Sequence, residues 1–505
     1  MPLFAVGALA AVAVTAWLVI GHERAKERQR DAASAYARAW AARDVSAMWR
    51  ALSPEARRDY PIARFRSLVR DVDRRVGVRA VRVGSPDGPQ DGVVRVPAAV
   101  VTERFGTLRG TVALPVDEGG VRWRPHLRLP GLRPGEAVRV RTIESERDHG
   151  LLLARDGNPL EVDPALAKFA PGLERYFAQR LRGTPAAELR FGDRVVARRK
   201  AQPGRPVRST LRPRLQRQVD AALGNRLGGI AVLDPRNGDV LALGGVAVSA
   251  PQPPGSTFKI ITAAAALEAG ITSPDRTYPV RTGVTLSGVR IANAGGEACG
   301  GTLYNSFVHS CNSVFAPLGA EVGARRLVEM AERFGFNRRP RVPVAKPSRI
   351  SPPDQLPDSL HVGSAAIGQE KDLATALQMA SVAATVAGGG VRAEPRVARH
   401  QPVIRRRVIS RRTADRLRSM MIGVVRSGTG TAAALPGVTV AGKTGTAELR
   451  FTGSGASNPA NEDAWFVAFA PAQRPRVAVA VMLVGAGAGG KAAAPIARRV
   501  LAAAL

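Results

Sequence analysis

Two residues with the chemistry of a nucleophile and a base lie three positions apart near the middle of the chain. Ser256 and Lys259 follow a Pro-Pro-Gly break in PPGSTFKIITAAAAL, residues 253–267. A helix that begins at Ser256 would place both side chains on one face, where a neutral lysine can take the proton of the serine hydroxyl. The helix N-terminus would add N–H groups that stabilise an oxyanion. Alone, Ser-x-x-Lys is a weak signal, because it also arises by chance in solvated helices.

Two further short motifs follow the first in chain order. A Ser-x-Asn lies in HSCNSVF, and a Lys-Thr-Gly followed by a second threonine lies in VAGKTGTAEL. Apolar residues flank the Lys-Thr-Gly motif as in a β-strand, and its glycine would let a substrate approach the backbone. Three short motifs in one order make chance a poor explanation. The candidate site residues that they add are Ser310, Asn312, Lys443, Thr444, Gly445 and Thr446.

Together the three motifs resemble those of penicillin-binding proteins and serine β-lactamases. The resemblance covers residues 205–505. Residues 365–390 are similar to the Ile-Gly-Gln…Leu-Gln-Met-Ala helix of transpeptidases, with Glu370 where the family usually has glycine. SGTGTAA and DAWFVAFAP flank the Lys-Thr-Gly strand as in the family. The similarity implies a class B-like penicillin-binding protein with a C-terminal serine β-lactamase/transpeptidase-like domain, an antiparallel sheet flanked by helices.

The resemblance implies a D,D-transpeptidase that cross-links peptidoglycan stem peptides and is acylated by β-lactams. Ser256 would attack the D-Ala-D-Ala bond and form an acyl-enzyme, with Lys259 as the base. Ser310 would relay a proton to the leaving amine, and Asn312 would hydrogen-bond Lys259 and the substrate amide. An amine of a neighbouring stem would then attack the ester. A polytopic glycosyltransferase is the partner that the family leads us to expect.

The Lys-Thr-Gly strand would complete this site. Lys443 would help to keep Lys259 neutral, because a nearby cation lowers the pKa of a lysine. Thr444 and Thr446 would hold the substrate carboxylate, and the backbone N–H groups of Ser256 and Thr446 would hold the oxyanion. We expect no metal and no organic cofactor, and the six histidines are dispersed rather than gathered into a ligand-like cluster.

Other activities share these motifs. A class A β-lactamase would need a deacylating glutamate, and the chain has no convincing Glu-x-x-x-Asn; class D enzymes and sensor-transducers usually have valine where this chain has Asn312. A D,D-carboxypeptidase stays open, although the C-terminal GKAAAPIARRVLAAAL resembles a packed final helix rather than an amphipathic anchor. A catalytically silent scaffold of a cell-wall synthesis complex would not need the intact serine. Residues 22–205 are too few, and lack the acidic motifs, for a glycosyltransferase domain.

The first residues predict a membrane anchor. PLFAVGALAAVAVTAWLVIG, residues 2–21, carries no charge and is long enough to cross a bilayer as one helix. We expect an uncleaved single-pass anchor at residues 1–22 and an extracytoplasmic catalytic domain at the cell membrane; a cleaved signal peptide is the alternative. The positive charges follow the helix, which by the positive-inside rule conflicts with this orientation. A misplaced start codon would remove the conflict.

Cys299 and Cys311 are the only two cysteines of the chain. In the oxidising compartment expected outside the membrane, a disulfide between them is favoured. Such a bond would fix the segment that carries the Ser-x-Asn motif. Two unpaired thiols are the alternative, and geometry decides between them.

The composition argues against a nucleic-acid binding protein, despite a formal net charge of +33. Only eight of the basic residues are lysines, and the arginines are scattered through an Ala-, Gly- and Val-rich chain, as GC-rich codon bias produces. Aromatic residues, at 5%, are too few for the stacking platforms of single-strand binders. Attraction to anionic lipids or wall polymers remains compatible with the charge.

The remaining residues predict a multidomain α+β chain. Residues 31–52 have the pattern of an amphipathic helix, a second helix follows Ser53, and alternating apolar and polar residues then predict antiparallel strands. The buried stripe of the first helix comprises Tyr36, Trp40, Met48 and Trp49. We expect a small α+β cone-like domain at 30–131, similar to the nuclear transport factor 2-like domain of some penicillin-binding proteins. Residues 132–204 are expected to form a linker or pedestal region, because HGLLLARDGNPLE resembles the opening of the class B linker domain.

Overall fold

The computed structural model describes residues 3–143, 149–448 and 458–505. The chain packs into two units, one of residues 1–149 and 182–204 and one of residues 150–181 and 205–505. The residues of the predicted linker region are therefore divided between the two units. The domain boundaries drawn from the sequence stay predictions.

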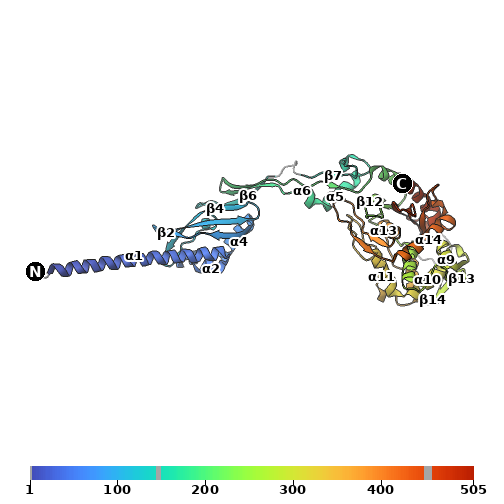
Figure 1. Ribbon diagram of the computed structural model, residues 1–505, viewed down its shortest axis with the longest axis horizontal. Helices are drawn as coiled ribbons and strands as arrows, with labels where there is room; N and C mark the ends of the chain where they lie inside the picture. Colours follow the sequence, from blue (N-terminus) through green and yellow to red (C-terminus); the bar gives the residue numbers. More distant parts are fainter. Residues whose placement is uncertain (1–2, 144–148, 449–457) are drawn as a thin grey trace. The chain divides into compact units, whose positions relative to one another are not determined.

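Helices and antiparallel strands form the N-terminal unit (Figure 1). Its helices are α1 (Leu3–Ala41), α2 (Val45–Arg50), α3 (Pro54–Asp59) and α4 (Ile62–Val76). Its strands are β1 (Val78–Val83), β2 (Asp87–Gln90), β3 (Val93–Thr102), β4 (Thr107–Asp117), β5 (Gly120–Val121), β6 (Val138–Ile143), β8 (Ala186–Phe191) and β9 (Arg194–Arg199). The first sheet has the order β1-β3-β4-β5 with β2 beside β3, and β6, β8 and β9 form a second sheet.

The single helix predicted over residues 31–52 is wrong, because the chain breaks between α1 and α2. Arg43 adopts a left-handed φ of 57°, and the carboxylate of Asp44 accepts hydrogen bonds from two backbone N–H groups at the start of α2. Aspartate at this position competes with helix continuation by capping the next helix. The amphipathic period hides the break, since both helices turn apolar residues to the same core. The predicted stripe is buried at Tyr36, Trp40 and Met48 and partly buried at Trp49.

Helix α1 contains the predicted anchor segment, residues 2–21. The side chains of residues 1–16, 18 and 19 lie outside the described residues, as do residues 1 and 2 altogether. In the part of the chain that the structure describes, no helix combines the length and the apolar character that a bilayer crossing requires.

A buried hydrogen bond stabilises the core of the N-terminal unit. The indole Nε1 of Trp123 donates to the hydroxyl of Tyr36 at 2.9 Å, and both side chains are 1% exposed. The rings of Tyr60 and Phe65 pack edge-on against Trp123. Burial raises the pKa of Tyr36, so the hydroxyl stays protonated. The indole N–H therefore has one neutral acceptor inside an otherwise apolar core.

Tyr36→Phe is expected to lower the free energy of unfolding of this unit by about 1–3 kcal/mol, because the buried indole N–H loses its acceptor. Denaturant unfolding of the whole chain, followed by tryptophan fluorescence, measures the change. Tyr176→Phe removes a hydroxyl from a side chain that is 48% exposed and serves as the matched control. Equal stability of the two variants would contradict this account of the core.

A five-stranded antiparallel sheet forms the centre of the C-terminal unit, in the order β12-β11-β21-β20-β19. Its strands are β11 (Gly228–Leu233), β12 (Val240–Gly245), β19 (Ala441–Glu448), β20 (Glu462–Ala470) and β21 (Val477–Leu483). Helices α7 (Pro213–Leu223) and α15 (Gly489–Ala504) cover one face, and α13 (Ala376–Ala387) covers the other. Because both faces are covered, the central strands are apolar throughout. The Lys-Thr-Gly strand β19 lies at one edge, as a substrate-binding strand requires.

Helices α10 (Asn312–Val322), α11 (Ala324–Phe334), α12 (Ser359–Ala366) and α14 (Arg411–Ser427) pack around the buried helix α8. The unit also contains α5 (Ala170–Tyr176), α6 (Ala178–Arg182) and α9 (Leu303–Val308). Paired short strands complete it: β7 (Leu152–Leu153) with β10 (Val207–Arg208), β13 (Thr277–Arg281) with β16 (Cys299–Thr302), β14 (Gly283–Leu286) with β15 (Val289–Ala292), and β17 (Val391–Ala393) with β18 (Arg405–Arg407). Helix α8 (Lys259–Glu268) is buried from Lys259 to Leu267. Its alanines are small enough for α10, α11 and α14 to pack closely around it.

Candidate functional site

Ser256 and Lys259 lie where the chain enters the buried helix α8. Ser256 belongs to a 3-10 turn, η5 (Gly255–Phe258), and α8 begins at Lys259. The helix predicted to begin at Ser256 thus opens with a tighter turn, in which residues three apart lie almost above one another. Lys259 is fully buried, whereas Ser256 is half-buried. The Ser256 hydroxyl makes no hydrogen bond with any residue that the structure describes, so its lone pairs are open to a reaction partner.

Close backbone packing places this turn against β19. Gly255 has a φ of +51°, and a Cβ there would lie 2.5 Å from the carbonyl oxygen of Thr446. A Cβ at Gly445 would lie 2.9 Å from the carbonyl oxygen of the residue before Gly255. Only glycine permits both the left-handed turn and this approach. The backbone N–H groups of Ser256 and Thr446 therefore belong to segments in direct contact.

Ser310 lies in the short connection between α9 and α10. Its φ of 62° is left-handed, which costs a non-glycine residue on the order of 1 kcal/mol. Cys311 follows as the N-cap of α10, and Asn312 is the first residue of that helix. The side-chain amide of Asn312 donates to the carbonyl oxygen of Ala292 at 2.8 Å, which turns its Oδ1 toward the site. The local backbone thus holds the Ser-x-Asn side chains in one direction.

The three motifs meet around two lysines. Lys259 Nζ donates to Asn312 Oδ1 at 2.6 Å, to the carbonyl oxygen of Ser310 at 2.7 Å and to Ser310 Oγ at 3.2 Å. Lys443 Nζ donates to the same Ser310 Oγ at 2.9 Å. One hydroxyl therefore bridges two lysines that are 184 residues apart in the numbering, 259 and 443. Such a bridge is a path along which a proton can move.

Burial sets the charge state of both lysines. It holds the pKa of Lys259 well below its ordinary value, with a further lowering by the charge of Lys443. Burial alone lowers the pKa of Lys443 to about 7. No carboxylate contributes to either shift. The rings of Phe315 and Phe307 lie 5.6 Å from the respective Nζ atoms and offset part of the cost of a buried cation. A lysine in this environment can be neutral, as a general base must be.

Hydroxyl groups line the Lys-Thr-Gly strand. The Oγ1 atoms of Thr444 and Thr429 are 2.6 Å apart, and Thr446 Oγ1 accepts a hydrogen bond from the first N–H of α15 at 3.4 Å. Thr429 was not among the predicted site residues, although the SGTGTAA stretch that contains it was a signal. A Cβ at Gly428 would clash with the carbonyl oxygen of Val308, so glycine lets this stretch lie against α9 as well as β19. Thr429 thus adds a third hydroxyl to this part of the site.

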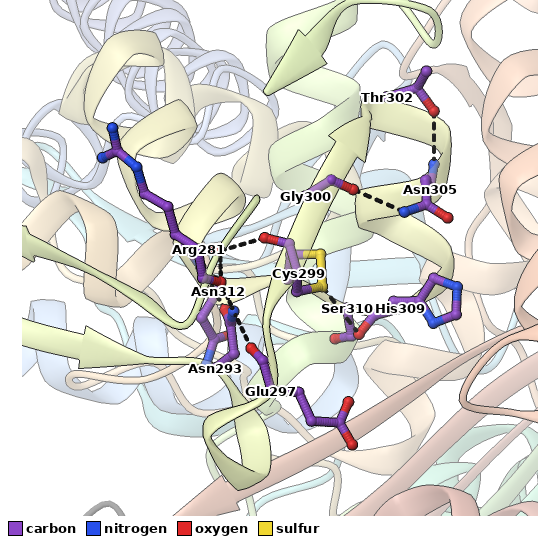
Figure 2. Close-up of a disulfide and its surroundings, with 12 residues drawn as sticks. Arg281, Asn293, Glu297, Cys299, Gly300, Thr302, Asn305, His309, Ser310 and Asn312 are labelled. Atoms are coloured by element: carbon purple, nitrogen blue, oxygen red, sulfur yellow. Dashed lines mark hydrogen bonds between the residues drawn. A yellow bond between two sulfur atoms is a disulfide. The ribbon is translucent and has the colours of Figure 1, made fainter. Parts of the chain in front are cut away.

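Cys299 and Cys311, the pair favoured from the sequence, form a disulfide (Figure 2). It joins the start of β16 to the residue in the middle of the Ser-x-Asn motif. Beside it, the side-chain amide of Asn293 donates to the carbonyl oxygens of Arg281 at 2.7 Å and Glu297 at 2.8 Å (Figure 2). The disulfide and these hydrogen bonds fix the entry to α10. Across the described ranges, no group of His, Cys, Asp or Glu side chains could hold a metal ion.

Comparison with known proteins finds matches to this half of the chain. The family described as "Penicillin binding protein transpeptidase domain" matches residues 228–502. The chain is 38% identical over 287 residues to the peptidoglycan D,D-transpeptidase PbpA of Mycobacterium tuberculosis, covering 51% of this chain and 56% of PbpA. PbpA of Mycolicibacterium smegmatis is 37% identical over 284 residues, with the same coverage. The matched part thus spans about half the length of these relatives.

Solved structures show the same similarity. The D,D-transpeptidase domain of a peptidoglycan glycosyltransferase from Eggerthella lenta aligns with a TM-score of 0.61 and 29% identity, over 71% of this chain and 98% of that one. Penicillin-binding protein A from M. tuberculosis, as a penicillin G acyl-enzyme complex, aligns with a TM-score of 0.54 and 28% identity, over 81% of this chain and 96% of that one. These structures therefore share the mixed α/β architecture described above.

Proposed function

This chain belongs to the family of penicillin-binding protein transpeptidase domains, and we propose that it is a peptidoglycan D,D-transpeptidase that works through a serine acyl-enzyme. The observation that carries the proposal is the hydroxyl of Ser310, bridged between the buried amines of Lys259 and Lys443. The relatives named peptidoglycan D,D-transpeptidase and the penicillin G acyl-enzyme of a similar structure support it.

Acylation uses a neutral Lys259. Its Nζ takes the proton of Ser256 Oγ as that oxygen attacks the carbonyl carbon of the D-Ala-D-Ala bond. The N–H groups of Ser256 and Thr446 stabilise the oxyanion of the tetrahedral intermediate. The proton passes through Ser310 Oγ to the leaving nitrogen, the C–N bond breaks, and terminal D-alanine departs. Asn312 orients Lys259 by the hydrogen bond to its Oδ1.

Deacylation reverses this path with a new amine. A neutral amine of a neighbouring stem peptide attacks the ester carbonyl, Lys259 takes the amine proton, and Ser256 Oγ leaves with a proton to regenerate the hydroxyl. The product is a cross-link between two stems.

Before acylation, the carboxylate of the donor peptide or of a β-lactam is bound by Lys443, Thr444, Thr446 and Thr429, because a cation and hydroxyl donors complement that anion.

The N-terminal half of the chain is proposed to attach the enzyme to the cell membrane. The uncharged residues 2–21 support a single-pass anchor, which would hold the catalytic unit outside the cell membrane. The helices and antiparallel sheet of the N-terminal unit support the nuclear transport factor 2-like assignment. A spacer or docking module fits that unit, and a polytopic glycosyltransferase that supplies new glycan strands is the partner we propose for the complex.

Incubation of the purified chain with benzylpenicillin tests the proposed function. We expect intact-mass spectrometry to show one stable drug adduct, and peptide mapping to place it on Ser256. Rapid drug consumption without an adduct would instead indicate a β-lactamase, and absence of both would indicate a silent scaffold. A stem-peptide donor incubated with and without an amine acceptor then separates cross-linking from carboxypeptidase hydrolysis.

Lys443→Gln is expected to move the rising limb of the acylation pH profile to higher pH. The charge of Lys443 lowers the pKa of Lys259, so its removal raises that pKa and leaves less neutral Lys259 at a given pH. Glutamine keeps a donor for Ser310 Oγ. Acylation rates measured by intact mass across the pH range in which both proteins stay folded give the two profiles. A lower rate with an unshifted limb would contradict electrostatic coupling of the two lysines.

A further inference from the structure

An exposed carboxylate lies in a strained position beside the nucleophile turn. Glu370 has a left-handed φ of 63° and an exposed side chain. Glycine suits this backbone, whereas glutamate costs on the order of 1 kcal/mol. The Glu370 carboxylate makes no hydrogen bond or ion pair with any residue in the described part of the chain. The strain therefore holds a free carboxylate where folding alone would favour glycine.

A backbone hydrogen bond links the segment that carries Glu370 to the residue before Ser256. Gly255, the residue before the nucleophile, donates its N–H to the carbonyl oxygen of Gly368 at 2.9 Å. A Cβ at Gly368 would clash with the backbone of Gly255, so the two glycines touch. Glu370 follows Gly368 by two residues, which span at most about 7 Å. Its carboxylate is thus carried by the segment that packs against the nucleophile turn.

A second acid in this segment, Asp372, is buried away from solvent. Asp372 is fully buried, and neither of its carboxylate oxygens has a hydrogen-bond partner among the described residues. Burial, with the charge of Glu370, holds the pKa of Asp372 well above its ordinary value. Asp372 therefore presents no carboxylate to solvent. Of these two acids only Glu370 presents its carboxylate to solvent, beside the exposed Lys371.

Deacylation by an amine acceptor would benefit from a negative charge near the nucleophile. An amine acceptor is an ammonium ion in water, yet the site around Ser310 contains two lysines and no ion-paired carboxylate. The charge of Lys443 attracts the donor carboxylate and repels a second cation. Glu448, two residues beyond Thr446 on β19, already has an interaction partner. Glu370 offers an exposed carboxylate, with no partner among the described residues, on the segment that packs against the nucleophile turn.

We propose that Glu370 binds the ammonium group of the acceptor stem peptide and so sets the preference of the acyl-enzyme for a cationic amine over water. This inference rests on the proposed function, because it assigns the acceptor side of the same site. Glu370 acts before the attack: it raises the local concentration of the amine and orients it. The ammonium group then loses one proton to solvent, and the neutral amine attacks the ester while Lys259 takes its second proton as described above.

Partitioning of the acyl-enzyme tests this inference in the full-length chain. A small acyl-D-alanyl thioester forms the acyl-enzyme, and the ratio of aminolysis to hydrolysis is measured with two acceptors: the side-chain amine of Nα-acetyl-lysine amide, which is cationic, and hydroxylamine, which is uncharged at neutral pH. The variants are Glu370→Gln, Glu370→Lys and, as the matched control, Glu448→Gln, which changes an exposed glutamate at the end of β19. Thioester consumption without acceptor reports the acylation half of the reaction separately.

We expect Glu370→Gln to raise the KM for the cationic acceptor about threefold, the effect of losing one exposed ion pair, and Glu370→Lys to raise it further. The KM for hydroxylamine should not change in any variant, nor should that for the cationic acceptor in Glu448→Gln. Equal losses with both acceptors, or a loss in Glu448→Gln alone, would overturn the inference. Failure of the wild-type chain to form an acyl-enzyme would overturn the proposed function itself.

Discussion

Lys259→Met is expected to slow the acylation of Ser256 by benzylpenicillin by about 10²–10⁴-fold, the contribution of a positioned general base. In the mechanism that we propose, neutral Lys259 takes the proton of Ser256 Oγ. No other amine in the described site donates to both Ser310 and Asn312. Methionine has a similar length and fills the buried space beside Phe315 without a charge. The loss should therefore reflect chemistry rather than collapse of α8.

Time courses of the drug adduct, followed by intact mass, measure this effect. Ser256→Ala gives the zero baseline, and Lys346→Met, which replaces an exposed lysine, is the matched control. Thermal unfolding of each variant checks that the fold persists. Should Lys259→Met keep more than a tenth of the wild-type rate, another group must take the proton, and the assignment of Lys259 would have to be withdrawn.

The sequence predicted the elements of the site better than the contacts between them. Flanking apolar residues predicted a strand for Lys443, Thr444 and Thr446, and the Pro-Pro-Gly break predicted a helix entry at Ser256, because both are local signals. The bridge of Ser310 Oγ between two lysines depends on the left-handed backbone at Ser310. No pattern in a serine, cysteine and asparagine specifies that backbone, which the surrounding structure imposes.

Local signals also misled where a capping residue interrupts an apolar period. The apolar period over residues 31–52 favours one helix, but the capping preference of Asp44 ends it. Thr429 was overlooked for a different reason. Its partner Thr444 is 15 positions away, and tertiary packing, which includes that of Gly428 against α9, brings the two hydroxyls together. Contacts of this kind follow from tertiary packing, which a single sequence does not display.

Removal of the disulfide in the Cys299→Ala/Cys311→Ala variant is expected to lower the free energy of unfolding by about 3 kcal/mol, for a loop that spans 12 positions. It should also slow acylation by up to about tenfold. The disulfide fixes the position of Cys311, which lies between Ser310 and Asn312 in the sequence. The left-handed backbone at Ser310 costs on the order of 1 kcal/mol. Without the cross-link, relief of that strain can turn Ser310 Oγ away from Lys443.

Thermal unfolding and acylation rates, each measured with and without dithiothreitol, separate the two effects. Dithiothreitol should lower the unfolding temperature and the acylation rate of the wild type. It should change neither in the double alanine variant, which therefore controls for non-specific effects of the reductant. If stability falls while the acylation rate stays constant, the disulfide supports the fold but does not hold the Ser-x-Asn geometry. A fall in both would instead mean that the strained backbone at Ser310 depends on the bond to Cys299, so that the oxidation state of one cysteine pair controls the proton path between Lys259 and Lys443.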